Sequence, residues 1–299
     1  MSDEPQDAFD LAQRLRGIVD IPSGRGDEVV WSIAKSYQKI RLKAKDPSLV
    51  RAAKKIAIRA IIERTLQQLG PTRMPLESKH VEYAPGIEGD IDIQDTLDNT
   101  PAMRMLQPSD IVLERKELKH LACVLMIDAS LSMTGEKLAM ATSSIAVLAH
   151  RLRGIDYAVV LFENKANVIK PMAVQADLEK LIGDLLDLNA MGYTNIEEGL
   201  KAGLRELELS RTPNKIGIVV TDGNYTMGRD PRVFAAMFPK LHVVMTTGLD
   251  AREDICSGMA ARGKGSMYEI RNYEDMPKVL YRIIKTFHLR LNQGRAPVI

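Results

Sequence analysis

The sequence is short of the features that mark secreted, membrane-spanning or disulfide-stabilised proteins. It has two cysteines, Cys123 and Cys256, which are far apart and form no C-x-x-C pair. We therefore expect buried thiols in a reducing compartment rather than a disulfide framework. No apolar run approaches the roughly 20 residues that a membrane-spanning helix needs. The first ten residues, MSDEPQDAFD, are acidic and polar, unlike a secretory signal. These absences predict a cytoplasmic protein.

A large net charge is missing as well. The formal charge is +2 at pH 7, so the whole chain has no general attraction to nucleic acid or membranes. The charge is uneven, however, because eleven lysines and arginines between Lys35 and Arg73 are opposed by only Asp46 and Glu63. Such a basic helical face fits a nucleic acid or an acidic partner, and it is equally typical of a solvated helix surface. Few aromatic residues are interleaved, which argues against single-stranded nucleic acid.

Periodicity and turn residues divide the chain into four segments. Asp46-Pro47 is a helix start signal and Gly70-Pro71 a stop signal, so the beginning of the chain reads as helical. A stretch rich in proline, glycine and acidic residues follows, as in a linker or a strand-and-turn arm. We expect a basic helical N-terminal region (1–72), an acidic linker or extended arm (73–117), an α/β domain (118–291) and a tail (292–299).

The α/β domain alternates apolar strands with amphipathic helices. Two continuous apolar runs, LACVLMID at 121–128 and KIGIVVTD at 215–222, each end in an acid, which is typical of buried parallel strands. DYAVVLFE at 156–163 and ANVIK at 166–170 read as a hairpin. The alternation predicts a doubly wound, mostly parallel sheet with helices on both faces.

Oxygen-bearing side chains gather where two of these strands end. Ligands of open α/β sheets bind at the carboxyl ends of the strands. Asp128, Ser130 and Ser132 alternate along the stretch that follows the first run, so in an extended turn their side chains point the same way. Asp222 ends the second run, and Thr194 stands at the start of a helix between the two. These five side chains are the candidate site.

The donor atoms of this set predict a hard divalent cation. All five are oxygen donors, with no histidine or cysteine among them. Such a set suits Mg²⁺ or Mn²⁺, and less well Ca²⁺, while zinc is disfavoured. Two carboxylates balance the charge of the ion, and a water position is left that a carboxylate of another protein can take. By itself, Asp-x-Ser-x-Ser is also explained by turn or helix-capping residues.

At these residues the chain resembles the von Willebrand factor A-type (VWA) domain with its metal-ion-dependent adhesion site (MIDAS). The resemblance covers 118–291 and implies a six-stranded sheet with a hairpin edge strand. It implies that the first motif supplies Asp128, Ser130 and Ser132, the second Thr194 and the third Asp222. The stretch from Gly192 to Leu200 is similar to the G-x-T-x-(I/L)-x-x-G-L of the bacterial branch.

A narrower resemblance concerns the segment before this domain. IDIQDTLD at 91–98, followed by Ile111-Val112-Leu113, is similar to the segment that precedes the VWA domain in the magnesium chelatase D subunit and in CoxE-like proteins. It implies a partner, an AAA+ ATPase of the MoxR/chelatase type or its client, and a role in metal or cofactor insertion or enzyme maturation. Two departures stand out. No Walker A motif is present, and Leu131 stands where many relatives have glycine.

Little in the sequence supports catalysis. The five histidines are scattered, so Ser130 and Ser132 have no evident general base. A Mg²⁺ hydrolase would use a second carboxylate cluster, or a lysine aimed at the site, to handle phosphate, and we see neither pattern. We expect no enzyme, at most a non-catalytic subunit of a chelatase-like assembly. The alternatives are a nucleic-acid-binding module that uses the basic helices, and a Mg²⁺-dependent hydrolase.

Overall fold

The computed structural model covers the 299-residue chain. The structure describes residues 26–68, 76–100, 104–118, 121–129, 136–152, 155–175, 177–187, 193–248, 250–271 and 275–293. The chain divides into two compact units, residues 1–72 with 121–283 and residues 73–120 with 284–299. The domain boundaries predicted above stay predictions.

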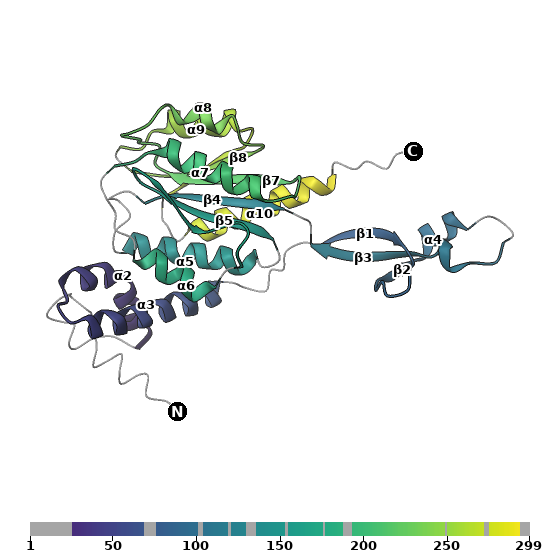
Figure 1. Ribbon diagram of the computed structural model, residues 1–299, viewed down its shortest axis with the longest axis horizontal. Helices are drawn as coiled ribbons and strands as arrows, with labels where there is room; N and C mark the ends of the chain where they lie inside the picture. The colour runs from purple at the N-terminus through teal and green to yellow at the C-terminus, as the bar shows by residue number, and fades with distance from the viewer. Residues whose placement is uncertain are drawn as a thin grey trace. The chain divides into compact units, whose positions relative to one another are not determined.

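A six-stranded sheet forms the centre of the first unit (Figure 1). Its strand order is β6-β5-β4-β7-β8-β9, and every neighbouring pair is parallel except β5 with β6. This confirms the predicted fold, a mostly parallel α/β sheet of the VWA type with a hairpin at one edge. The strands are β4 (Ala122–Asp128), β5 (Asp156–Phe162), β6 (Ala166–Lys170), β7 (Lys215–Thr221), β8 (Leu241–Thr246) and β9 (Met267–Ile270).

Helices lie on both sides of this sheet. Val124 and Met126 of β4 belong to a core that includes residues of α7, α8 and α9, whereas α5 and α6 lie on the opposite side (Figure 1). None of the described helices combines the length and apolar content that a bilayer crossing requires. The helices of this unit are α2 (Gly26–Lys43), α3 (Pro47–Gln68), α5 (Glu136–Arg151), α6 (Leu178–Leu186), α7 (Ile196–Leu209), α8 (Pro231–Ala235) and α9 (Glu253–Arg262), and α10 (Met276–Gln293) follows them.

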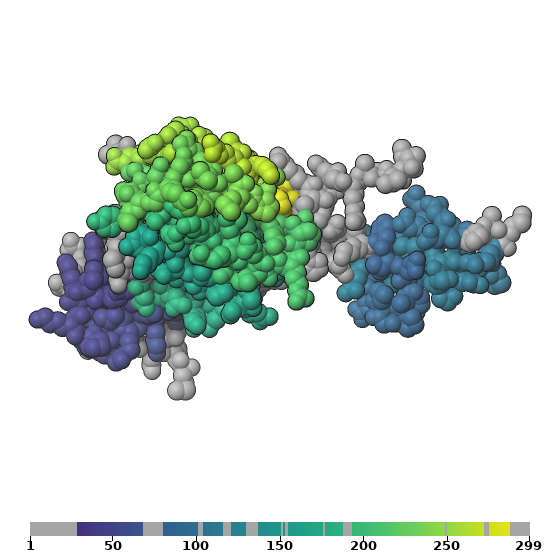
Figure 2. Space-filling model, turned by 45° about the horizontal axis from the view of Figure 1, so that its top comes forward, coloured from purple at the N-terminus to yellow at the C-terminus, as the bar shows by residue number. Residues whose placement is uncertain are grey.

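The helical N-terminal region packs on α5 and α6. Ile33 of α2 and Ile61 of α3 are fully buried and share an apolar cluster with Ala146 of α5. Lys54 of α3 forms an ion pair with Asp187, just after α6, at 2.6 Å. Figure 2 shows the purple atoms of α2 and α3 directly against the teal atoms of this unit. These helices therefore cover an apolar surface that α5 and α6 would otherwise expose.

The second unit contains a three-stranded antiparallel sheet within the segment predicted as a linker or extended arm. The strand order is β1-β3-β2. Thr96, the buried residue of the small helix, accepts a hydrogen bond from Val112 N at 2.9 Å and so fixes the helix to β3. The elements are β1 (Leu76–Glu82), β2 (Asp90–Asp92), α4 (Ile93–Asn99), the 3₁₀ turn η1 (Pro108–Asp110) and β3 (Val112–Leu118).

Both cysteines are free and buried, as the sequence predicts. Cys123 lies in β4 and Cys256 in α9. Burial raises the pKa of each thiol to about 12. Neither side chain forms a reactive thiolate near neutral pH.

Helix α7 lies very close to the sheet because two of its residues have no side chain. A Cβ at Gly199 would lie 2.4 Å from Cδ1 of Phe162, and a Cβ at Gly203 would lie 2.3 Å from Sδ of Met126. Both neighbours are fully buried. This close packing fixes the position of the start of α7 relative to the ends of the strands.

Glu197, buried in the first turn of α7, fixes the loop that follows β7. Its Oε1 accepts from Nη2 of Arg229 and from Nζ of Lys201, each at 2.8 Å. Its Oε2 accepts from the backbone N of Arg229 at 2.6 Å. These donors, Arg229 first, lower the pKa of Glu197 to about 2.

Gly199→Ala should destabilise the domain. Alanine is the better helix former by about 0.5–1 kcal/mol, but forcing a methyl group against a buried ring costs about 1–3 kcal/mol. We expect the free energy of unfolding, measured by urea titration, to fall by about 1–2 kcal/mol. The control is Gly183→Ala in α6, where the Cβ would meet the flexible end of Lys54 at 3.2 Å. Equal stability of the two variants would contradict the close approach of α7.

Glu197→Gln should remove part of the acid sensitivity of the fold. The folded pKa is about 2, below the ordinary value of 4.5, so the carboxylate contributes its full stabilisation above about pH 4.5 and loses it as the pH falls toward 2. We expect the variant to be less stable near neutral pH and to show a flatter decline between those values, measured by urea unfolding. Glu198→Gln is the control, since among the described residues the side chain of Glu198 forms an ion pair with Lys201 alone. The same flattening in the control would refute the role of Glu197.

Candidate metal centre at the sheet edge

Asp128, the first predicted ligand, is the last residue of β4. The strand is buried along its whole length, and Asp128 itself is 6% exposed. Its Oδ2 accepts a hydrogen bond from Oγ1 of Thr221 at 2.9 Å. Thr221 ends the neighbouring strand β7, which runs parallel to β4. The hydrogen bond therefore links the carboxyl ends of two adjacent strands and orients one carboxylate oxygen.

Asp222, which follows Thr221 directly, is held in a tight turn. Its Oδ1 accepts from Asn224 N at 2.9 Å, and its backbone O accepts from Arg252 N at 2.7 Å. Gly223 has a φ of +80°, and a Cβ there would lie 2.6 Å from the backbone O of Arg252. The turn thus requires glycine, and it keeps Asp222 at the strand end.

The surroundings of Asp222 favour a bound cation. Burial raises the pKa of this carboxyl group, and the negative charge of Asp250 adds to the effect. Lys137, an exposed residue at the start of α5, acts in the opposite direction. The ion pairs between described residues include none from Lys137 to Asp222. A divalent cation would stabilise the ionised form that burial disfavours.

Thr194 is attached to the loop that begins at Asp222. It is 5% exposed and directly precedes Asn195, the N-cap of α7. Its backbone O accepts from Thr226 N at 2.9 Å and from Met227 N at 3.1 Å. Its backbone N donates to Oγ1 of Thr226 at 3.0 Å. The start of α7 and the end of β7 are thereby joined at the same edge of the sheet.

Three of the five predicted ligands therefore lie at one edge of the sheet. Asp128 and Asp222 lie at neighbouring strand ends, and Thr194 lies in the adjoining loop. Ser130 and Ser132 lie outside the described residues, as do Leu131 and Gly192. Two carboxylates and a hydroxyl at one sheet edge fit a hard cation such as Mg²⁺ or Mn²⁺. The complete ligand set stays a prediction.

Two threonines that position the site are absent from the predicted set. Thr221 orients Asp128, and Thr226 holds Thr194. A hydroxyl directly before Asp222 at the end of a buried strand was a usable signal for Thr221. Thr226 had no such signal, because its partner lies 32 residues away in the sequence.

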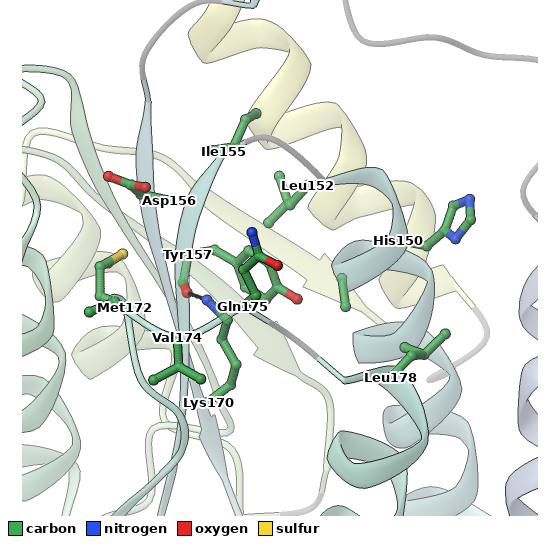
Figure 3. A pocket seen from close by; sticks show the side chains of 12 residues that line it. His150, Leu152, Ile155, Asp156, Tyr157, Lys170, Met172, Val174, Gln175 and Leu178 are labelled. Carbon is green, nitrogen blue, oxygen red and sulfur yellow. Dashed lines mark hydrogen bonds between the residues drawn. The ribbon is translucent and has the colours of Figure 1, made fainter.

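A pocket of about 600 Å³ lies away from these residues (Figure 3). Tyr157, at the amino end of β5, lines it and pairs in register with Cys123 at the start of β4, so the pocket lies at the opposite end of these strands from Asp128. Lys170, which ends β6, donates to the backbone O of Tyr157 and lies 3.9 Å from the centre of its ring. Burial lowers the pKa of Lys170. The lysine satisfies a carbonyl at the edge of the sheet and takes no part in the candidate metal centre.

Comparisons with known proteins agree with this architecture. The family model of the von Willebrand factor type A domain matches residues 123–224, a span that contains Asp128, Thr194 and Asp222. No curated protein sequence resembles the chain closely enough to count as a match.

The chain is similar to several solved structures at low sequence identity. A D319A mutant of the PilB minor pilin from Streptococcus sanguinis is 15% identical with a TM-score of 0.51, over 62% of this chain and 66% of that one. The conserved hypothetical protein BatB from Bacteroides thetaiotaomicron is 18% identical with a TM-score of 0.46, over 56% of this chain and 98% of that one. Proximal thread matrix protein 1 from the mussel byssus, described with a zinc-occupied MIDAS motif, is 16% identical with a TM-score of 0.48, over 56% and 46%.

The family match and the sheet topology lead to the same conclusion. The matched span runs from β4 to the turn after β7, and the strand order places the hairpin β5–β6 at one edge, next to β4. Residues 123–224 match the von Willebrand factor type A family model, and the six-stranded sheet that they help to form has a fold of this type.

Proposed function

We propose that this protein is a divalent-cation-dependent protein-binding module and not an enzyme. In this proposal Asp128, Ser130, Ser132, Thr194 and Asp222 hold Mg²⁺, with Mn²⁺ or Ca²⁺ as alternatives, and a carboxylate of a partner protein completes the coordination. The observation that carries the proposal is the pair of carboxylates at the ends of β4 and β7, joined through Thr221.

The chemistry of the site follows from the number and kind of its donors. Mg²⁺ takes six oxygen ligands and keeps water where the protein supplies too few. Asp128 and Asp222 would balance the double charge, while hydroxyl groups add donors without charge. An acidic side chain of a partner can then replace a bound water. The ion supplies the attraction between the two proteins, and this chain supplies its position.

The partner class rests on sequence resemblance. The segment 91–98 is similar to the one before the VWA domain of the magnesium chelatase D subunit and CoxE-like proteins, which work with AAA+ ATPases. We propose a MoxR- or chelatase-type ATPase, or its client, as the partner, with a cytoplasmic role in metal or cofactor insertion or enzyme maturation. The three similar structures reported above are named as pilin, matrix and hypothetical proteins, and these three names mention no such ATPase.

Asp128→Asn should strongly weaken Mg²⁺ binding without unfolding the domain. Asparagine removes the charge but keeps an oxygen that can accept from Thr221, whereas alanine would leave that buried hydroxyl without its acceptor, at a cost of about 1–3 kcal/mol. We expect the Mg²⁺ affinity, measured by isothermal titration calorimetry, to fall by at least about tenfold. Circular dichroism should show an unchanged fold.

The matched control is Asp156→Asn. Asp156 also accepts from a hydroxyl group, Oγ of Ser210 at 2.7 Å, but it lies at the amino end of β5. A purified MoxR-type ATPase should bind wild type and this control in Mg²⁺, and should bind neither in a chelator. Asp128→Asn should not bind the ATPase in either condition. Binding that survives both the chelator and Asp128→Asn would overturn the metal-dependent mechanism. Because one relative is described with zinc in its MIDAS, the calorimetry includes Zn²⁺ beside Mg²⁺.

Thr194→Ala should weaken Mg²⁺ binding less than Asp128→Asn does. The variant loses an uncharged donor, and the hydrogen bonds from Thr194 to Thr226 and Met227 use backbone atoms that alanine retains. The same calorimetric titration measures the difference. An effect as large as that of Asp128→Asn, or no effect at all, would show that Thr194 does not act as an uncharged ligand.

A further inference from the structure

A second group of possible metal ligands lies in the three-stranded sheet of the other unit. His80 comes from β1, Asp92 ends β2 and Asp95 lies in α4. One ring nitrogen and one carboxylate oxygen from each aspartate all lie within 4.8 Å of one another. None of the three belongs to the sheet edge that carries Asp128 and Asp222, so this cluster needs its own explanation.

Each ring nitrogen of His80 lies near one of the two carboxylates. Its Nδ1 contacts Oδ2 of Asp95, and its Nε2 lies 3.5 Å from Oδ2 of Asp92. The other oxygen of Asp92, Oδ1, is occupied by a hydrogen bond from Asp95 N at 3.0 Å, which leaves Oδ2 for the imidazole side. In the part of the chain that the structure describes, no lysine or arginine forms an ion pair with Asp92 or Asp95.

We propose that His80, Asp92 and Asp95 form a binding site for a transition-metal dication, with Zn²⁺ as the best fit. Zinc takes imidazole nitrogen and carboxylate oxygen at about 2.0–2.2 Å, usually in tetrahedral geometry. Two ligands of such a centre lie about 3.4 Å apart, close to the 3.5 Å between Nε2 of His80 and Oδ2 of Asp92. Zinc takes one nitrogen of an imidazole, so Asp95, which contacts Nδ1, would have to turn toward the ion to bind it as well. The donor set differs from the all-oxygen set at the sheet edge, because the nitrogen favours zinc over Mg²⁺.

The exposure and charge of the cluster fit an ion with an open position. The side chains of His80, Asp92 and Asp95 are 44%, 21% and 43% exposed, so water can reach the fourth position. Two carboxylates and a neutral imidazole carry two negative charges, which a dication balances.

An ion at this place would join three elements of the small unit. Among the described contacts, α4 is fixed to β3 through Thr96. Its apolar residues Ile93 and Leu97 are 71% and 64% exposed. A metal bound by residues of β1, β2 and α4 would attach this helix at a second point. It would thereby fix the orientation of Ile93 and Leu97.

The test is a zinc titration of the full-length protein in the Asp128→Asn background, followed by calorimetry near neutral pH. This background removes the first site, so the two proposals can fail separately. We expect about one equivalent of Zn²⁺ to bind, with no displacement by Mg²⁺. His80→Ala and Asp95→Asn should each weaken zinc binding by at least about tenfold. Glu82→Gln, which removes another exposed carboxylate of β1, should leave it unchanged.

X-ray absorption at the zinc edge gives a second readout. The zinc-loaded protein should show one imidazole ligand together with oxygen donors, and this imidazole signal should vanish in His80→Ala. Zinc binding that is unaffected by His80→Ala, or the absence of binding near neutral pH, would overturn the proposal. Mg²⁺ binding by the wild-type protein would remain intact in either case.

Discussion

The hydrogen bond from Thr221 to Asp128 joins two strands that have almost no polar side chains of their own. Strands β4 and β7 are buried on both faces, so an ionised carboxylate is tolerated only where they end and water or an ion can reach it. Parallel neighbours end at the same edge, which places Asp128 beside the turn that carries Asp222. The hydroxyl of Thr221 satisfies one oxygen of Asp128, and it also accepts from Gly223 N. One side chain thus sets both acidic positions.

The loop after β7 is fixed at two points by the start of α7. Thr194 binds it at Thr226 and Met227 through backbone atoms, and Glu197 binds it at Arg229 through a buried carboxylate. Helix α7 can serve as this anchor because Gly199 lets it lie directly against β5. The close packing of α7 on the sheet therefore affects the proposed metal site. It determines how accurately the hydroxyl of Thr194 and the carboxylate of Asp222 can share an ion.

Continuous apolar runs made the large sheet predictable. Each run is long enough for one strand, and its acidic end marks the ligand-binding edge, so both the fold and the positions of Asp128 and Asp222 follow from local sequence. The small sheet has no such pattern. Strands β1 and β3, LESKHVE and VLERKEL, pair charged residues with charged residues in register, so neither face shows apolar alternation. The contacts of Thr226 with Thr194 and of Arg229 with Glu197 each join residues 32 positions apart in the sequence. No local sequence pattern predicts them. Ser130 and Ser132 stay predictions.

The two proposed ion sites differ in their ligand sets, and this difference would keep each site selective for its own ion. Affinity alone would not separate them, because zinc exceeds most divalent metals at ordinary nitrogen and oxygen ligands and could enter an all-oxygen site too. Separation must come from ligand number and type. An edge site of carboxylates, hydroxyls and water offers zinc none of its preferred nitrogen, and it suits a hard cation with six ligands. The cluster at His80 offers one nitrogen and two oxygens, too few to compete with water for Mg²⁺. In this scheme zinc acts on the shape of the small unit, while Mg²⁺ acts on partner binding. The occupancy of each site could then change independently of the other.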